Sequence, residues 1–317
     1  MRNLKRALSL ALAAIMLIGM MVVSASAASY NNLTDKDEIV NKDAVSMLVS
    51  LGIIEGKPDG SYGPTENVDR AQMAKMLSVI MNKGVDNSAL YQSVNSGLVD
   101  VNTNWAKGHI NYCYTTGIIA GRGNGKFDPS ATVTALEAAK MLLVAVGYDP
   151  AIEGFEGADW AINVSVRADE QGIFEGFTKD LSAPLNRDDA ALLIYNALDV
   201  EMIQSYTTNN YPIAYSDHRT ILADKYGVIK VQGVVVANEW ASLASDDGDA
   251  ALKEGKTTIY NGEGIFSTTG NTTVSKEDAS LKTQTFNVST PVDMLGKTVN
   301  LYIKKNTILA DSTVYGD

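Results

Sequence analysis

One turn pattern occurs three times in this chain, and it constrains the fold more than any other feature. The copies are GIIEG at 52–56, GIIAG at 117–121 and GIFEG at 172–176. An apolar segment with helical spacing precedes each copy, and a second such segment follows it. The first glycine suits the left-handed residue that ends a helix. Internal repetition of this kind predicts tandem helix–turn–helix units.

The second helix of each unit begins with the same start signal. A good N-cap residue stands three positions before Gln, Glu or Asp, which is the spacing of a capping box. The three pairs are Asp69 with Gln72, Thr134 with Glu137, and Asn186 with Asp189. We therefore predict an all-α N-terminal part made of repeats at 33–84, 98–148 and 155–204.

A secretory signal is expected at 1–27. Arg2, Lys5 and Arg6 precede an apolar run, and the small residues Ala25-Ser26-Ala27 form a cleavage site. The alternative is a membrane anchor, because the run nearly reaches spanning length. The cleavage site favours removal, and the mature chain is then exported without a membrane segment.

Charge and cysteine content narrow the class of protein. The formal net charge is −11, and loss of the three signal-peptide cations moves it to about −14. Such a surface disfavours nucleic acid and anionic lipid as partners. The single cysteine, Cys113, excludes an internal disulfide framework and is interpreted as a buried apolar residue.

Beyond the repeats the pattern changes from helix to strand. Residues 205–224 are polar and rich in turn residues, and we interpret them as a linker. Strand-like runs follow at 228–237, 256–260, 283–289 and 297–304, with Gly233 as a bulge candidate. The predicted fold class is α+β in separate domains, with a small all-β barrel or sandwich at 225–317. We expect this β-rich part to be a shortened version of a longer surface protein.

At this point a resemblance becomes clear. The second repeat carries Asp100, Trp105-Ala106, Ile110, GIIAG, Asn124-Gly-Lys-Phe127, Pro129 and Val133-Thr-x-x-Glu137. This pattern resembles the S-layer homology (SLH) module, and three copies cover about 33–203. The resemblance implies a pseudo-threefold bundle whose grooves bind a secondary cell-wall polysaccharide, often bearing pyruvate ketals. It also implies that the protein lies at the bacterial cell wall in association with peptidoglycan. Self-assembly into an S-layer is a further possibility that the resemblance raises.

Candidate polysaccharide-binding residues follow from this resemblance and from the chemistry of helix starts. Arg70 and Arg187 occupy the first helical position, where a guanidinium would clamp a carboxylate beside free N–H groups. A solvated surface arginine is the plain alternative. Trp105 and Trp160 suit either sugar stacking or a core role. The remaining candidates are Asp35, Asp100, Gln72, Glu137, Gly121 and Gly123.

Three departures from the family pattern alter this expectation. Ala135 replaces the motif arginine in the second repeat, Val40 replaces the tryptophan in the first, and the third turn is three residues shorter. We therefore expect one or two competent grooves instead of three equal ones.

The search for catalytic chemistry finds little. His109 and His218 lie far apart, and no zinc, nucleophile-elbow or phosphate-loop motif is present in the sequence. The acidic run at 246–249 does not have EF-hand spacing and is interpreted as a solvated turn. We predict no cofactor, no metal site and no enzymatic activity, although a spatial pair of carboxylates remains open.

Three hypotheses from different classes follow. The favoured one is non-enzymatic anchoring of an exported protein to the cell wall through the polysaccharide. The second makes the β-rich part a carbohydrate- or partner-binding unit that the repeats tether. The third, a wall-remodelling glycoside hydrolase, lacks a catalytic constellation.

Overall fold

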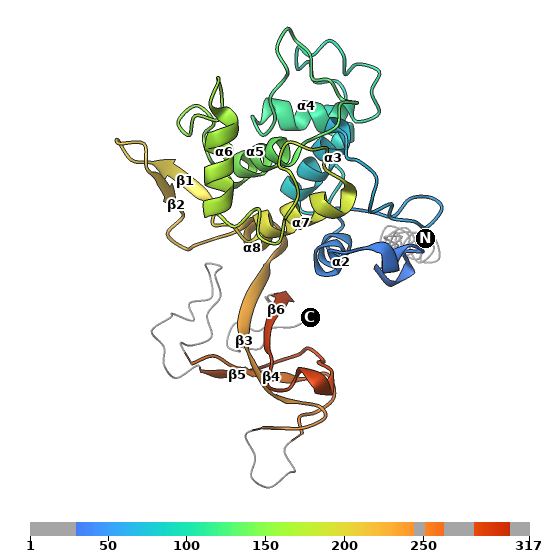
Figure 1. Cartoon of the computed structure of the whole chain (residues 1–317), viewed down its shortest axis with the longest axis vertical. Coiled ribbons are helices and arrows are strands. Elements are labelled where there is room, and N and C mark those ends of the chain that lie inside the picture. The colour runs from blue at the N-terminus through green and yellow to red at the C-terminus, as the bar shows by residue number, and fades with distance from the viewer. Residues whose placement is uncertain (1–29, 244–250, 263–281, 305–317) are drawn as a thin grey trace, which may run out of the picture.

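The computed structural model describes residues 30–243, 251–262 and 282–304. Helices occupy the first two thirds of this part, and a four-stranded antiparallel sheet follows them (Figure 1). The fold is therefore a mixture of helices and antiparallel sheets, as the sequence predicts. The expected signal segment at 1–27 and the acidic run at 246–249 lie outside the described residues.

Each expected repeat contains its two helices. Short 3₁₀ turns (η) at Tyr30–Asn32, Lys36–Glu38 and Ser88–Tyr91 accompany them. The helices are α2 (Lys42–Ser50) and α3 (Arg70–Met81), α4 (Lys107–Thr115) and α5 (Ala135–Val146), and α6 (Trp160–Glu170) and α7 (Arg187–Leu198).

The repeated glycine ends the first helix of each pair. Gly52, Gly117 and Gly172 have φ of 69°, 77° and 70°, a backbone conformation that costs glycine little. The next residue's N–H then donates to a carbonyl of the last helical turn, for example from Ile118 to Cys113 at 2.9 Å. This bond turns the chain back over the helix it has just left.

The starts of the three second helices meet in a closed ring of backbone hydrogen bonds. The N–H of Val133 donates to the carbonyl of Val68, that of Leu185 to Val133, and that of Val68 to Leu185, at 2.8–2.9 Å. Each residue lies just before an N-cap, and Asp69, Thr134 and Asn186 all cap as predicted. The reciprocal half of the capping box forms only at Gln72 and Glu137.

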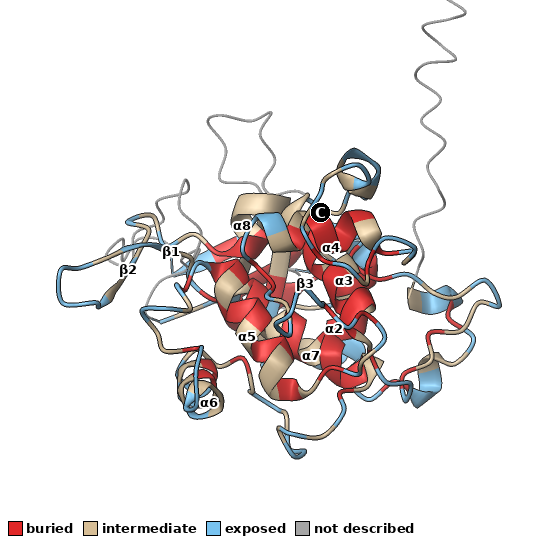
Figure 2. Cartoon of the chain, turned by 90° about the horizontal axis from the view of Figure 1, so that it is seen from above, coloured by how far each residue is buried: buried red, intermediate tan, exposed pale blue. Residues whose placement is uncertain are grey.

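The buried side chains of the helices belong to one continuous core. Figure 2 shows them concentrated on α2, α3, α5 and α7, while α6 carries more exposed surface. Ile110 and Phe127 of the second repeat and Leu77 of the first are among the residues with no appreciable exposure. The loops between paired helices contribute apolar residues such as Phe127 to this core and carry the polar groups discussed below.

The segment 205–224, expected to be a linker, is largely structured. Strands β1 (Ile203–Tyr206) and β2 (Pro212–Ala214) form an antiparallel hairpin, and α8 (Ile221–Tyr226) follows. Ile221 and Leu222 are buried in the helical core. The sequence around these two apolar residues is polar, which is why the segment reads as a linker.

The C-terminal strands form one open sheet in the order β5-β4-β3-β6. They are β3 (Val228–Asn238), β4 (Thr257–Tyr260), β5 (Thr283–Phe286) and β6 (Thr298–Lys304), with a 3₁₀ turn at Val292–Met294. The expected barrel is wrong for the described residues, whose strands do not close on themselves, and they show no second sheet packed against the first. Gly233 is not the bulge either. The register shifts between Val235 and Ala237, and Gly233 instead lets β4 approach closely.

Within the described ranges, we find no helix that is both long and apolar enough to span a membrane.

Candidate functional site

Arg70, the motif arginine of the first repeat, reaches into the second repeat. Its Nε donates to the carbonyl of Phe127 and its Nη2 to that of Ala120, both at 2.8 Å. The guanidinium carbon lies 4.4 Å from the centre of the Phe127 ring. Only 4% of the residue is exposed, so the plain alternative of a solvated arginine is wrong. The side chain fastens the two repeats together.

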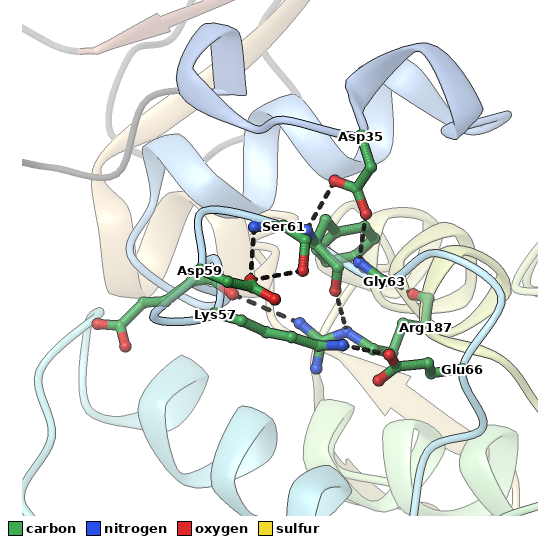
Figure 3. Close-up of polar contacts among 9 residues, drawn as sticks. Asp35, Lys57, Asp59, Ser61, Gly63, Glu66 and Arg187 are labelled. Atoms are coloured by element: carbon green, nitrogen blue, oxygen red, sulfur yellow. Dashed lines mark hydrogen bonds and ion pairs between the residues drawn. The ribbon is translucent and has the colours of Figure 1, made fainter.

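Arg187 repeats this contact between the third and first repeats (Figure 3). Its Nε donates to the carbonyl of Tyr62 at 2.8 Å, its Nη2 to that of Glu55 at 3.4 Å, and it lies 4.7 Å from the Tyr62 ring. The corresponding first helical residue of the second repeat, Ala135, is fully buried and has no such side chain. Two of the three junctions therefore contain an arginine link.

The two loops that receive these arginines are held by carboxylates. Asp35 accepts from the N–H groups of Tyr62 and Gly63, both at 2.7 Å (Figure 3). Asp100 accepts from Phe127 and Asp128 at 2.9 and 2.8 Å. Burial alone would raise the pKa of each carboxyl, but the backbone hydrogen bonds outweigh it and lower both. Asp35 and Asp100 therefore fix the shape of the two loops.

A cleft of about 480 Å³ lies where the second and third repeats meet beside Arg70. Its walls come from the GIIAG turn, from α5 and from the chain that enters α6. They are Arg70, Ile118, Ala120, Gly121, Arg122, Glu137, Lys140, Met141, Phe155, Glu156, Gly157 and Trp160.

Cations outnumber carboxylates in this cleft, although the whole chain is acidic. Arg70, Arg122 and Lys140 face Glu137 and Glu156. Burial, with help from nearby Arg122, lowers the pKa of Arg70 to about 10, so Arg70 stays charged at neutral pH. Arg122 pairs with Glu137 at 2.5 Å.

Lys140 and Trp160 form the other wall. The ammonium of Lys140 lies 5.7 Å from the centre of the Trp160 ring and donates to the carbonyl of Phe155 at 2.5 Å. Burial lowers the pKa of Lys140. A cation beside a flat, partly exposed indole can bind a sugar ring and an attached acidic group together.

The structure gathers some of the predicted residues here and leaves others elsewhere. Arg70, Trp160, Glu137 and Gly121 line the cleft, whereas Arg187, Asp35, Asp100, Gln72, Gly123 and Trp105 do not. Gln72 completes the capping box of α3. Trp105 is 58% exposed at the start of α4, where its ring meets the edge of His109.

Sequence reasoning missed Lys140, Arg122 and Glu156 as lining residues. One signal was available for Lys140. Apart from Glu137, it is the only charged residue in α5, whose remaining ten residues are apolar. A lone lysine in such an apolar helix indicates a position that is open to solvent or to a polar partner, because lysine is almost never fully buried unpaired.

A Ser–His–Asp arrangement does exist, but it is buried. Ser78 Oγ lies 2.6 Å from Nδ1 of His109, whose Nε2 lies 3.6 Å from a carboxylate oxygen of Asp86. Ser78 and His109 are each 4% exposed. A nucleophile must reach its substrate, so this network holds α3 to α4 and does not form an active site.

The described residues hold no group of three or more His, Cys, Asp or Glu side chains suited to a metal ion.

Comparison with known proteins assigns the first two repeats to a domain family. The model of the S-layer homology domain matches residues 32–74 and 99–139, which are most of the first repeat and most of the second. The "Cell surface protein" of Thermoanaerobacter kivui is 28% identical over 84% of this chain and 32% of its own length. The "S-layer protein" of Bacillus licheniformis is 33% identical over 36% of this chain and 12% of its own.

A third relative carries an enzyme name. "Exoglucanase XynX" of Acetivibrio thermocellus is 30% identical over 50% of this chain and 15% of its own length. The chain thus spans about a third or less of the length of these relatives.

The paired helices, arginine-linked loops and family match define a class: tandem-repeat modules of surface proteins. This chain contains S-layer homology domains, and its relatives support a place at the cell-wall surface.

Proposed function

We propose that the repeats anchor the protein to the cell wall without catalysis, by binding an anionic, pyruvylated wall polysaccharide in the cleft beside Arg70. The observation that carries this proposal is the convergence of Arg70, Lys140 and Trp160 on one cleft. The relatives named as cell-surface and S-layer proteins support a role at the wall.

The chemistry of the cleft fits a carboxylated sugar. The two carbonyl bonds of Arg70 use Nε and Nη2, which leaves the Nη1 protons for a carboxylate. Partial burial strengthens this attraction relative to a surface pair, because less water screens it. Trp160 supplies a ring on which the sugar can stack.

The same proposal includes three repeats arranged around a pseudo-threefold axis. The closed ring formed by Val68, Val133 and Leu185 supports it. We propose unequal grooves, because Ala135 interrupts the arginine series and the third loop is shorter. The groove beside Arg70 then contributes most of the binding.

Co-sedimentation of the exported chain with purified cell-wall sacculi tests the proposal, before and after acid extraction of the secondary polymer. Binding should be lost on extraction and weakened about tenfold by Lys140→Gln, which removes one charge-assisted contact. Lys42→Gln, at the exposed start of α2, is the matched control and should bind like the parent.

Binding that survives extraction would make peptidoglycan the ligand and refute the polysaccharide. Equal losses on altering each of the three repeats would refute a dominant groove. Release of reducing ends from wall polymer would refute a purely anchoring role.

A further inference from the structure

A second cleft, of about 670 Å³, lies between the helices and the C-terminal sheet. Its lining comes from α2, α7, α8, β3, the turn before β6, and β6. The lining residues are Asp43, Ser46, Met47, Ser50, Leu51, Tyr195, Leu222, Val228, Met294, Thr298, Val299, Asn300 and Tyr302.

One wall is the less buried face of α2, where Met47 still packs against the helical core. Residues 43, 46, 47 and 50 share this face by helical spacing, and all are partly or fully exposed. The opposite face buries Ala44, Val45, Leu48 and Val49 in the core. The core thus holds α2 rigidly while its second face remains accessible.

The facing wall is one side of β6. Thr298, Asn300 and Tyr302 alternate along the strand and therefore point to the same side of the sheet. Leu301 and Val299 belong to the other side of the strand. Leu301 is buried in the sheet's own core, and Val299 packs against that core while it also lines the cleft. The cleft therefore has a polar, preformed wall on each side.

Two tyrosines meet in this cleft across the helix–sheet boundary. The hydroxyls of Tyr195 and Tyr302 are 2.5 Å apart, and their rings lie edge to face with centres 6.0 Å apart. Only one of the two hydroxyl protons can lie between the oxygens, so the other can be donated to a ligand. The amide oxygen of Asn300 accepts from Gln232 at 3.1 Å, which leaves its NH₂ group as a further donor.

The charge of this cleft is the opposite of the first. Its lining contains no lysine or arginine, and Asp43 is its only carboxylate. Among the described residues, no cation lines this cleft for an anionic polymer to bind. Hydroxyls, an amide and a carboxylate interspersed with Met47, Val299 and two aromatic rings match a neutral sugar, whose rings have apolar faces and hydroxyl edges.

We propose that this cleft is a second binding site, specific for a neutral oligosaccharide. It is separate from the anchoring cleft and does not depend on it. Tyr302 and Asn300 donate hydrogen bonds to sugar hydroxyls, Asp43 accepts from them, and the tyrosine rings contact the apolar face of one sugar unit.

Calorimetric titration of the exported chain with chitotetraose, cellotetraose and maltotetraose tests this site. At least one should bind saturably, and Tyr302→Phe should weaken that binding about threefold to tenfold through loss of a hydrogen bond. Ser46→Trp should abolish it by filling the cleft. Tyr260→Phe, a 42% exposed tyrosine on β4 of the same sheet, should bind like the parent.

Circular dichroism of each variant establishes that the fold is intact. Failure of all three tetrasaccharides to bind the folded parent would overturn the proposal. So would saccharide binding that Ser46→Trp leaves unchanged, or binding of hexalysine in place of the sugars. Loss of saccharide binding in Lys140→Gln would place the sugars in the anchoring cleft and would equally contradict a separate site.

Discussion

Arg70 lies over the ring of Phe127, and its Nε donates a hydrogen bond of 2.8 Å to the carbonyl oxygen of the same residue. Arg187 has the same relationship with Tyr62 at another junction. Two arginines at equivalent helix starts thus fasten neighbouring repeats while one of them also lines a cleft. The structural role of Arg70 coincides with its proposed binding role, so the two must be tested with different variants.

Arg70→Ala should lower the unfolding free energy by about 3 kcal/mol, because it removes two buried, charge-assisted hydrogen bonds and a ring contact. Arg187→Ala should cost about 1–2 kcal/mol, because Arg187 is more exposed and one of its bonds is 3.4 Å long. Urea denaturation of both variants measures the difference. Equal costs would contradict the greater burial of Arg70.

Ala135→Arg should not create a third link, although it restores the motif residue. Ala135 is fully buried, so a larger charged side chain would overpack the core, at a cost of about 3 kcal/mol. Ala135→Gly adds no atoms and should cost about 1 kcal/mol in the same denaturation assay. A variant Ala135→Arg as stable as the parent would show that the third loop offers it acceptors.

Local sequence patterns predict the elements of each repeat but not the contacts between repeats. Helix pairs, turn glycines and N-caps depend on residues within a few positions of each other, so their patterns predicted them correctly. The partner of Arg70 depends on which repeat lies next to which, and no local pattern encodes that order. Trp105 and Trp160 match in sequence, yet Trp160 lines the cleft beside Arg70 and Trp105 does not. Ile221 and Leu222 are surrounded by polar residues in the sequence, so their burial was not predicted.

His109 should make stability depend on pH below about 6.5, the pKa of an unperturbed histidine. Burial lowers the pKa of His109 below 6.5, an effect that Lys75 reinforces and Asp86 opposes, and Ser78 and Trp105 complete its surroundings. In this range the unfolded chain binds more protons than the folded chain. The unfolding free energy should therefore decrease as pH falls.

Denaturation at a series of pH values measures this slope. His109→Gln should flatten it, and His218→Gln, which alters the chain's other histidine, should retain it. His218 is exposed and pairs with Glu201, so it serves as the matched control. An unchanged slope in His109→Gln would assign the effect to other groups.

Asp100→Asn should destabilise the protein by about 1–3 kcal/mol at pH 7, because one of two backbone N–H groups loses its acceptor. Folding lowers the pKa of Asp100 below its ordinary value of 3.8. The stability that this carboxylate contributes is therefore present above pH 3.8 and is lost as the pH falls through the folded-state pKa. The difference between variant and parent should therefore narrow in acid. Asp169→Asn, exposed on α6, should stay within about 0.5 kcal/mol of the parent throughout.

Gly108→Ala tests how tightly α4 packs against the preceding 3₁₀ turn. Alanine is the better helix former by about 1 kcal/mol, which alone would stabilise α4. A methyl group at this position would, however, lie 2.1 Å from the carbonyl oxygen and 2.7 Å from the carbonyl carbon of Ser88. Both are backbone atoms that cannot rotate away, and such overpacking costs about 1–3 kcal/mol.

We therefore expect Gly108→Ala to lower the unfolding free energy by about 1–2 kcal/mol in urea denaturation. Lys107→Ala, at the neighbouring helical position, reports helix propensity without the clash and should change it by less than about 0.5 kcal/mol. A stabilised Gly108→Ala would mean that the turn at Ser88–Tyr91 moves away from α4 at little cost. The contact between Gly108 and this turn would then not determine the position of α4.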